Sequence, residues 1–220
     1  MAPSTRIPPP LPYPQQVAIF SRFAEANPAP ETELEYLNPF TLVVAVALSA
    51  QATDVGVNKA TRGLFAVADT PQKMLELGLE GVTEHIKTIG LFRQKAKNVI
   101  ALSRILVEDF GGEVPDSRAA LMRLPGVGRK TANVVLSCAF GHPAQAVDTH
   151  IFRVGNRTRI APGRDVDEVE RAIEDNVPAR FQTHAHHWLI LHGRYICQAR
   201  RPRCAVCPIH DLCPFEEKTA

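Results

Sequence analysis

The chain contains no long apolar run and no stretch in which apolar and polar residues alternate. Its longest apolar run, Leu42 to Leu48, is far shorter than the roughly 20 residues that a membrane-spanning helix requires. The missing alternation argues against half-buried strands, and no repeat of fixed period indicates a solenoid. The sequence therefore excludes a transmembrane protein and gives no support to an all-β or repeat architecture.

The N-terminus lacks the charged start, apolar stretch and cleavage pattern of a secretory signal peptide. It is rich in proline instead, so we expect residues 1–15 to form an extended or disordered tail. We therefore expect a cytoplasmic protein, in which cysteines bind metal more often than they form disulfides.

The periodicity that does occur is helical almost throughout. From Phe92 to Phe110 apolar residues recur three and four apart, and Gly111-Gly112 ends the pattern. Cap signals predict the other helices: Asn38-Pro39 before Phe40 to Ser49, Asp54 before Val55 to Val67, Thr70-Pro71 before Gln72 to Leu77, Asp116 before a helix through Leu124, Asp165 before one through Asn176, and then Gln182 to Cys197. We predict an all-α fold of roughly ten helices, too many for one simple bundle, and hence two lobes with a cleft between them.

Acidic residues are absent between Asp175 and Asp211, although the net charge of the whole chain is only +2. Five arginines fall in this interval: Arg180, Arg194, Arg200, Arg201 and Arg203. A segment of one sign favours a phosphate backbone as partner, and the simpler alternative is a solvated basic face.

Cysteines are few, and four of the five are concentrated near the C-terminus with the spacing C-x6-C-x2-C-x5-C. Four thiolates within 17 residues can enclose one metal centre: Cys197, Cys204, Cys207 and Cys213. Tetrahedral zinc and a four-iron cluster both use such ligands, and the spacing alone does not decide between them.

A second motif lies upstream, in the string Leu124-Pro125-Gly126-Val127-Gly128-Arg129-Lys130-Thr131-Ala132. Pro125 ends one helix, and we expect Gly126 and Gly128 to form a tight turn with positive φ before the next helix. This helix-hairpin-helix pattern directs backbone N–H groups and a helix N-terminus at one spot, which can bind a phosphate oxygen without reading base sequence.

In the hairpin motif and the cysteine spacing the chain resembles the endonuclease III family of helix-hairpin-helix DNA glycosylases and abasic-site lyases. The resemblance covers nearly all of the chain beyond the proline-rich tail. Besides the hairpin and the cysteines it rests on Asn38-Pro39-Phe40, on the segment from Leu48 to Asp54, on Thr88-Ile89-Gly90-Leu91, on the segment from Val147 to Val154, and on the segment from His187 to Arg194.

The resemblance implies a fold and a cofactor. It implies a six-helix barrel domain over residues 32–142, with the hairpin motif at about 116–139, and a discontinuous cluster domain over 16–31 and 143–220, with DNA held in the cleft. The cysteine spacing matches that of the family's [4Fe-4S] cluster, and structural zinc becomes the minor alternative.

The resemblance also implies an activity: removal of oxidised pyrimidines and cleavage of the strand 3′ to abasic sites by β-elimination. Lys130 corresponds to the amine that forms a Schiff base with the sugar, and Asp148 to the catalytic carboxylate. From the residues alone, Lys130 as a phosphate contact and Asp148 as a helix N-cap are the simpler interpretations.

Gln51 and Leu91 correspond to the side chains that fill the gap left by the extruded nucleotide. Further DNA contacts are expected from Gly126, Gly128, Arg129, His150, Arg153, Arg200, Arg201 and Arg203. The expected partner is double-stranded DNA with damaged pyrimidines or abasic sites, bound by a monomer at the nucleoid of a bacterial cell.

Three alternatives compete with this interpretation. An adenine-mismatch glycosylase shares the hairpin and the cluster spacing, but that family lacks the lysine found here as Lys130. The other two are a non-catalytic DNA-binding module with zinc and a small iron–sulfur electron carrier. Strand nicking at abasic sites would exclude both, and the carrier also leaves the hairpin unexplained.

Overall fold

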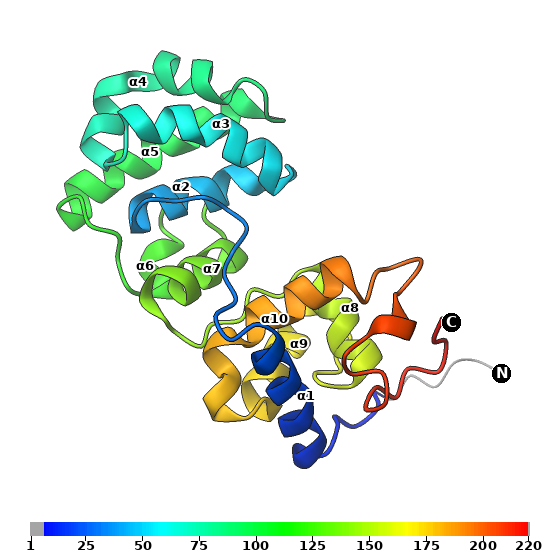
Figure 1. Ribbon diagram of the computed structural model, residues 1–220. Helices are drawn as coiled ribbons and strands as arrows, with labels where there is room; N and C mark the ends of the chain where they lie inside the picture. Colours follow the sequence, from blue (N-terminus) through cyan, green and yellow to red (C-terminus); the bar gives the residue numbers. More distant parts are fainter. Residues whose placement is uncertain (1–6, 220) are drawn as a thin grey trace. The chain divides into compact units, whose positions relative to one another are not determined.

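The structure, a computed structural model, describes residues 7–219 and contains no β-strand among them (Figure 1). The predicted all-α fold is confirmed. The chain divides into two compact units: the hairpin unit, Thr32–His142, and the cluster unit, which joins the residues up to Glu31 with those from Pro143 onward. No helix of the described part is long and apolar enough to cross a membrane.

Six helices form the hairpin unit, and the most apolar of them lies at its centre. They are α2 (Pro39–Ser49), α3 (Asp54–Val67), α4 (Pro71–Ile86), α5 (Phe92–Phe110), α6 (Arg118–Leu121) and α7 (Arg129–Phe140). Every residue of α2 from Phe40 to Leu48 is buried, and α3, α5 and α7 all pack against it. A helix that is apolar on all sides suits this central position, since it has no face left for water.

The cluster unit is built from helices distant in sequence. They are α1 (Tyr13–Ala26), α8 (Thr149–Thr158), α9 (Val166–Asn176) and α10 (Gln182–Tyr195), with short 3₁₀ turns η1 (Ala179–Phe181) and η2 (Cys204–Val206). Phe20 of α1 contacts the rings of Phe181 and Trp188, and the Trp188 indole N–H donates to the carbonyl of Asn27 at 2.8 Å. The N-terminal helix is thereby part of the same core as α8–α10.

Helix α1 begins within the segment that was expected to be a tail. Residues 1–6 lie outside the described residues, residues 7–12 are not helical, and α1 starts at Tyr13. Leu11 is 9% exposed, and its N–H donates to the Arg159 carbonyl at 2.8 Å. The expectation of an extended or disordered tail is therefore wrong from Leu11 onward, because one buried leucine and a proline-initiated helix anchor the chain.

Two of the predicted caps are wrong by one residue. Thr53, rather than Asp54, accepts the N–H of Gly56, and Ser117, rather than Asp116, accepts the N–H of Ala120. Asp116 instead lies 2.7 Å from Nε2 of His142, at the other end of the hairpin motif. The other caps, Asn38, Thr70 and Asp165, are confirmed.

Several helix ends also differ from the prediction. Helix α4 continues beyond Leu77 to Ile86, across a kink at Gly78 with φ 73° and ψ 174°. Helix α6 stops at Leu121 instead of Leu124, and α10 ends at Tyr195 instead of Cys197. Helix α5 has the predicted bounds because glycine at its C-cap, Gly111 with φ 63°, ends it in the left-handed conformation.

Candidate active site and cluster site

The hairpin between α6 and α7 is a tight turn held by backbone. Leu124 and Val127 are buried, and the Val127 N–H donates to the Leu124 carbonyl at 3.0 Å. Gly126 has φ 84°, as predicted. Gly128 does not have positive φ: it is the N-cap of α7, with φ −92° and ψ −178°, and nothing lies within 4 Å of where its Cβ would be. Open space at Gly128 leaves room for a group that approaches from outside.

Lys130 is the second residue of α7, and its side chain is exposed. No side chain caps the N-terminus of this helix. The positive end of the helix dipole favours an anion at this point. The hairpin thus combines a place for phosphate with a primary amine one turn away.

Gln51 and Leu91 share an uncommon backbone conformation. Their φ angles are 54° and 58°, in the left-handed region that residues other than glycine seldom adopt. Both side chains are exposed, Leu91 by 63%. The two turns lie close together, because a Cβ on Gly90 would be 4.0 Å from the Gln51 carbonyl oxygen. Strained turns that present an amide and an apolar side chain to solvent are typical of functional positions.

Asp148 begins α8 as its N-cap. Its Oδ1 accepts the N–H groups of His150 and Ile151, both at 2.9 Å. The capping role that the sequence suggested is therefore confirmed. The cap fixes the carboxylate at the N-terminus of α8.

Arg153 lies on the next turn of α8, and its guanidinium is engaged within the cluster unit. It donates to the carbonyls of Cys197 at 2.9 Å and Gly193 at 2.8 Å. His150 Nδ1 lies 3.3 Å from the same group. These bonds join α8 to the end of α10, so the guanidinium predicted to contact DNA is used internally.

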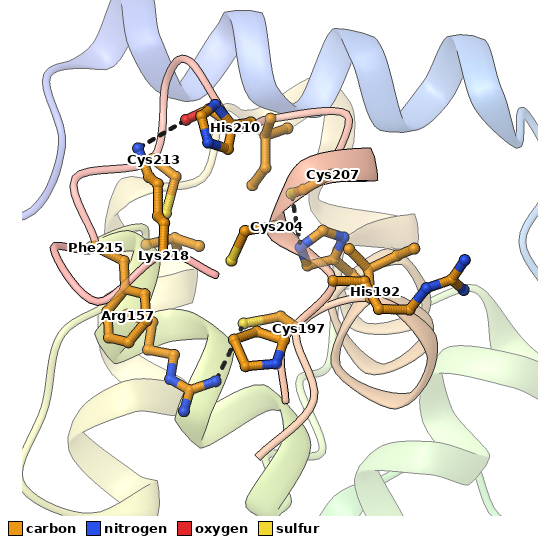
Figure 2. A pocket seen from close by; sticks show the side chains of 14 residues that line it. Arg157, His192, Cys197, Cys204, Cys207, His210, Cys213, Phe215 and Lys218 are labelled. Carbon is orange, nitrogen blue, oxygen red and sulfur yellow. Dashed lines mark hydrogen bonds between the residues drawn. The ribbon is translucent and has the colours of Figure 1, made fainter. Parts of the chain in front are cut away.

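The four C-terminal cysteines line one cavity of the cluster unit, and Figure 2 shows their side chains gathered around it. All four are free thiols and partly buried. Burial raises the pKa of the Cys207 thiol to about 11, and the neighbouring thiols act in the same direction. Burial also raises the pKa of Cys213. Such thiols become thiolates when a metal centre supplies compensating positive charge.

The arrangement of the thiols tests which metal centre fits. No group of three or more His, Cys, Asp or Glu residues in 7–219 is placed so that it could hold one metal ion. Zinc would require its sulfurs about 2.3 Å from a single centre. Four thiols that line one shared cavity are a donor set that can hold an iron–sulfur cluster.

Two arginines from other helices hold the cysteine segment in place. Arg157 of α8 donates to the carbonyls of Gln198 and Ala199, at 2.7 and 2.8 Å, and lies 3.7 Å from the Cys197 sulfur (Figure 2). Arg22 of α1 donates to the Pro208 carbonyl and to Asp211, each at 2.8 Å. Neither residue could be predicted from the sequence, because nothing in the local pattern connects α1 or α8 with a segment so distant in sequence.

Three arginines between the first two cysteines remain exposed: Arg200, Arg201 and Arg203. The segment that carries them is tied at both ends, since the N–H of Arg203 donates to the Ile196 carbonyl at 2.8 Å. Their side chains are therefore available to a charged partner while their backbone is held.

Comparison with known proteins decides the family. Residues 44–179 match the model of the HhH-GPD superfamily of base excision DNA repair proteins, and residues 197–213 match the iron–sulfur binding domain of endonuclease III. The chain is 61% identical to endonuclease III of Escherichia coli over 204 residues, which is 93% of this chain and 97% of the relative. It is 54% identical to that of Bacillus subtilis, covering 90% of each.

The chain belongs to the endonuclease III family. A solved structure of a trapped endonuclease III–DNA covalent intermediate matches with a TM-score of 0.84 and 44% identity, covering 93% of this chain and 96% of the other. Membership makes the chain a base excision repair enzyme, a DNA glycosylase with abasic-site lyase activity that carries a [4Fe-4S] cluster. The predicted family, activity and cofactor are confirmed, whereas the zinc module and the electron carrier are not.

Proposed function

We propose that the enzyme removes oxidised pyrimidines from double-stranded DNA and then cleaves the strand 3′ to the abasic site, with Lys130 as nucleophile. The single observation that carries this is the placement of Lys130 at the N-terminus of α7, directly after the hairpin. A hairpin that binds the phosphate backbone brings the sugar of the same strand within reach of that amine. The matched endonuclease III structures, solved with DNA, support the assignment.

The proposed chemistry needs only groups of the protein and the substrate. The neutral amine of Lys130 attacks C1′ of the sugar, and the damaged base leaves with the electron pair of the glycosidic bond. The nitrogen lone pair then opens the bond between C1′ and the ring oxygen, which takes up the proton that the amine gave to Asp148, and the product is an iminium ion, the Schiff base. Loss of a C2′ proton to water then expels the 3′ phosphate, which leaves with the electron pair of the C3′–O bond, and the strand breaks. Asp148 stabilises the positive charge that develops on the sugar and accepts the proton of the attacking amine.

Gln51 and Leu91 fill the space that the extruded nucleotide leaves in the stack. Unstacking and unpairing cost a few kcal/mol, and side chains that occupy the gap offset part of that cost. The exposure of both side chains on two adjacent turns suits this role. We propose further backbone contacts from Gly126, Gly128 and Arg129 in the hairpin, from His150, and from Arg200, Arg201 and Arg203.

Cys197, Cys204, Cys207 and Cys213 are the proposed ligands of the [4Fe-4S] cluster. When bound, the cluster supplies four metal–thiolate links that join segments of the C-terminal chain. The arginine-bearing loop then begins and ends at ligands, which favours rigid presentation of its guanidinium groups to phosphate. We assign residues 32–142 to a six-helix barrel domain and residues 16–31 with 143–220 to the cluster domain. We also propose a monomer that acts on the nucleoid in a bacterial cytoplasm.

Borohydride trapping on abasic DNA tests the proposal. Lys130→Gln should abolish the covalent adduct and strand nicking but leave binding to abasic duplex measurable, because the hairpin backbone is unchanged. Lys59→Gln, an exposed lysine on α3, serves as the matched control and should trap like the wild type. An adduct at wild-type level in Lys130→Gln would remove this lysine from the role.

A further inference from the structure

Two parts of the hairpin unit have to act as one rigid body in the proposed function. Leu91 enters the base stack, and the hairpin holds the phosphate backbone of the strand. Extrusion of a nucleotide costs free energy. If the hairpin could move relative to Leu91, the resistance of the duplex would deform the protein instead of extruding the nucleotide. A rigid connection between them is therefore a requirement of the mechanism.

Helix α5 provides that connection. Leu91 is its N-cap, with φ 58°, and the helix then continues without a break from Phe92 to Phe110. Its buried face packs against α4 and α2. Asn98 lies seven residues beyond Leu91, about 10 Å along the helix axis at 1.5 Å per residue.

Asn98 contacts the hairpin at the glycine that makes the turn. A Cβ built on Gly126 would lie 3.1 Å from Nδ2 and 3.3 Å from Cβ of Asn98. Gly126 is also the hairpin residue with positive φ, at 84°. The Asn98 side chain therefore lies against Gly126, where an added side chain would crowd it and would also strain the positive φ.

The orientation of the Asn98 amide is itself set by α5. Gln94, one turn closer to Leu91, donates from Nε2 to the Asn98 Oδ1 at 3.0 Å. This bond leaves the Nδ2 side of the amide facing Gly126. Helix α5 thus connects the side chain of Leu91 to the hairpin. The connection runs along the helix to Asn98, which faces Gly126.

We propose that Asn98 is a positioning residue, which seats the hairpin on α5 and so holds Lys130 at a fixed distance from Leu91. The inference rests on the proposed function of Lys130 and Leu91. Asn98 does not touch the reacting atoms. Its loss lets the hairpin move when the duplex resists extrusion, and a displacement of about 1 Å from the productive geometry can cost on the order of 100-fold in rate.

Single-turnover excision of one oxidised pyrimidine, in a fully paired duplex and in an unpaired bubble, tests the proposal. Asn98→Ala should slow excision in the duplex at least about ten-fold. The loss should be several times smaller in the bubble, where less extrusion work is needed. Asn98→Asp keeps the shape and the acceptor for Gln94, and should recover most of the duplex rate. The melting temperature should stay within a few degrees of the wild type, since Asn98 is only partly buried.

Asn176→Ala is the matched control. Asn176 is also a partly buried helical asparagine, whose Nδ2 donates to the Ala172 carbonyl at 2.7 Å, but it lies on α9 in the cluster unit. The Asn176→Ala variant should excise the oxidised pyrimidine from both substrates at the wild-type rate. Should Asn98→Ala fail to fold, Gln94→Ala removes only the bond that orients the amide, and it decides the question on the same two substrates.

A double-mutant cycle with Gly126→Ala gives a second, independent measurement. The added methyl group meets Asn98 and also strains the positive φ, and Asn98→Ala relieves only the first effect. The double variant should therefore be faster than the product of the two single losses predicts. Strictly multiplicative losses of rate, or equal losses of rate on duplex and bubble, would overturn the proposal.

If Leu91→Ala and Lys130→Gln are impaired while Asn98→Ala is not, this inference alone fails. If they too act like the wild type, the proposed function fails.

Discussion

In the hairpin unit the candidate functional side chains are exposed and are directed by backbone turns, whereas in the cluster unit the four C-terminal cysteines are partly buried and their segment is held by other side chains. Gln51, Leu91 and Gly126 all have positive φ in the first unit. In the second, Arg157 and Arg22 donate to carbonyls of the cysteine segment. The difference has a physical reason, since a surface that grips DNA must stay open and a metal centre must be enclosed.

The contrast extends to how each unit obtains its stability. The hairpin unit has a continuous apolar core around α2, and the four cysteines proposed as ligands all lie outside this unit. In the cluster unit, residues 196–219 contain only one short 3₁₀ turn, η2. A segment with so little regular structure depends on cross-links, and the cluster is the strongest one available to it.

The largest expected effect is loss of a proposed cluster ligand. Cys207→Ser should give protein without the broad absorption of an iron–sulfur cluster and with a cluster unit that unfolds at lower denaturant concentration. Cys138→Ser is the matched control: this thiol lies on α7 in the hairpin unit, where burial raises its pKa to about 12, and it should leave absorption unchanged. Equal absorption in Cys207→Ser and the wild type would contradict the proposed dependence of the cluster unit on a cluster bound through Cys207.

Acid should weaken the cluster unit through His187 of α10. Burial, with a smaller contribution from the charge of His184, lowers the pKa of His187 to about 4. Between pH 6.5 and about 4 the unfolded chain takes up a proton that the folded chain does not, so stability falls as pH falls through this window. At pH 5 the loss is about 2 kcal/mol.

His187→Asn removes this titration. Denaturant unfolding followed by Trp188 fluorescence, at pH 7 and pH 5, should show a smaller acid-induced loss of unfolding free energy in the variant than in the wild type. An identical loss in both proteins would exclude His187 as a source of the pH dependence.

Lys95 is the corresponding buried base of the hairpin unit. It is 7% exposed, and its Nζ has no hydrogen-bond partner among the described residues. Burial lowers the pKa of Lys95, because the buried site disfavours the charged ammonium. The folded state is therefore destabilised at any pH at which Lys95 is protonated. Its stability should rise as the pH increases toward the ordinary titration range of lysine. Lys95→Met keeps the length of the side chain and removes the amine.

The variant should therefore gain about 1 kcal/mol in unfolding free energy at neutral pH, since an unpaired buried amine is unfavourable. Lys97→Met, at an exposed position of the same helix, should show no gain. A loss of stability in Lys95→Met would mean that the amine is satisfied in solution.

The smallest effect on stability is expected at Gly128. Alanine fits its φ of −92° and meets no neighbour within 4 Å, so Gly128→Ala should change the unfolding free energy by only a few tenths of a kcal/mol. Its affinity for abasic duplex should nevertheless decrease, because the methyl group occupies the space in front of the α7 N-terminus. Unchanged affinity in a salt titration would argue that phosphate does not approach there.

Much of the fold and of the candidate site could be predicted from local patterns. Asn38, Thr70 and Asp165 are caps that act over three residues, and α5 is bounded by a glycine whose conformation is local. The cysteine spacing and the hairpin string likewise lie within short segments, and on these the resemblance rested. The errors at Asp54 and Asp116 arose where threonine or serine lay next to the aspartate and either could cap.

Sequence by itself thus determined the helical class, the two motifs and the chemical groups they contain, because periodicity, caps and ligand spacing are short-range properties. Only the tertiary structure showed that Arg157 and Arg22 hold the cysteine segment, that Arg153 is used internally, and that Asn98 lies under Gly126. These contacts join residues as far as 189 positions apart, and no local pattern encodes which distant side chains meet. Packing of whole helices decides them, since each helix brings its polar side chains to wherever its apolar face is buried.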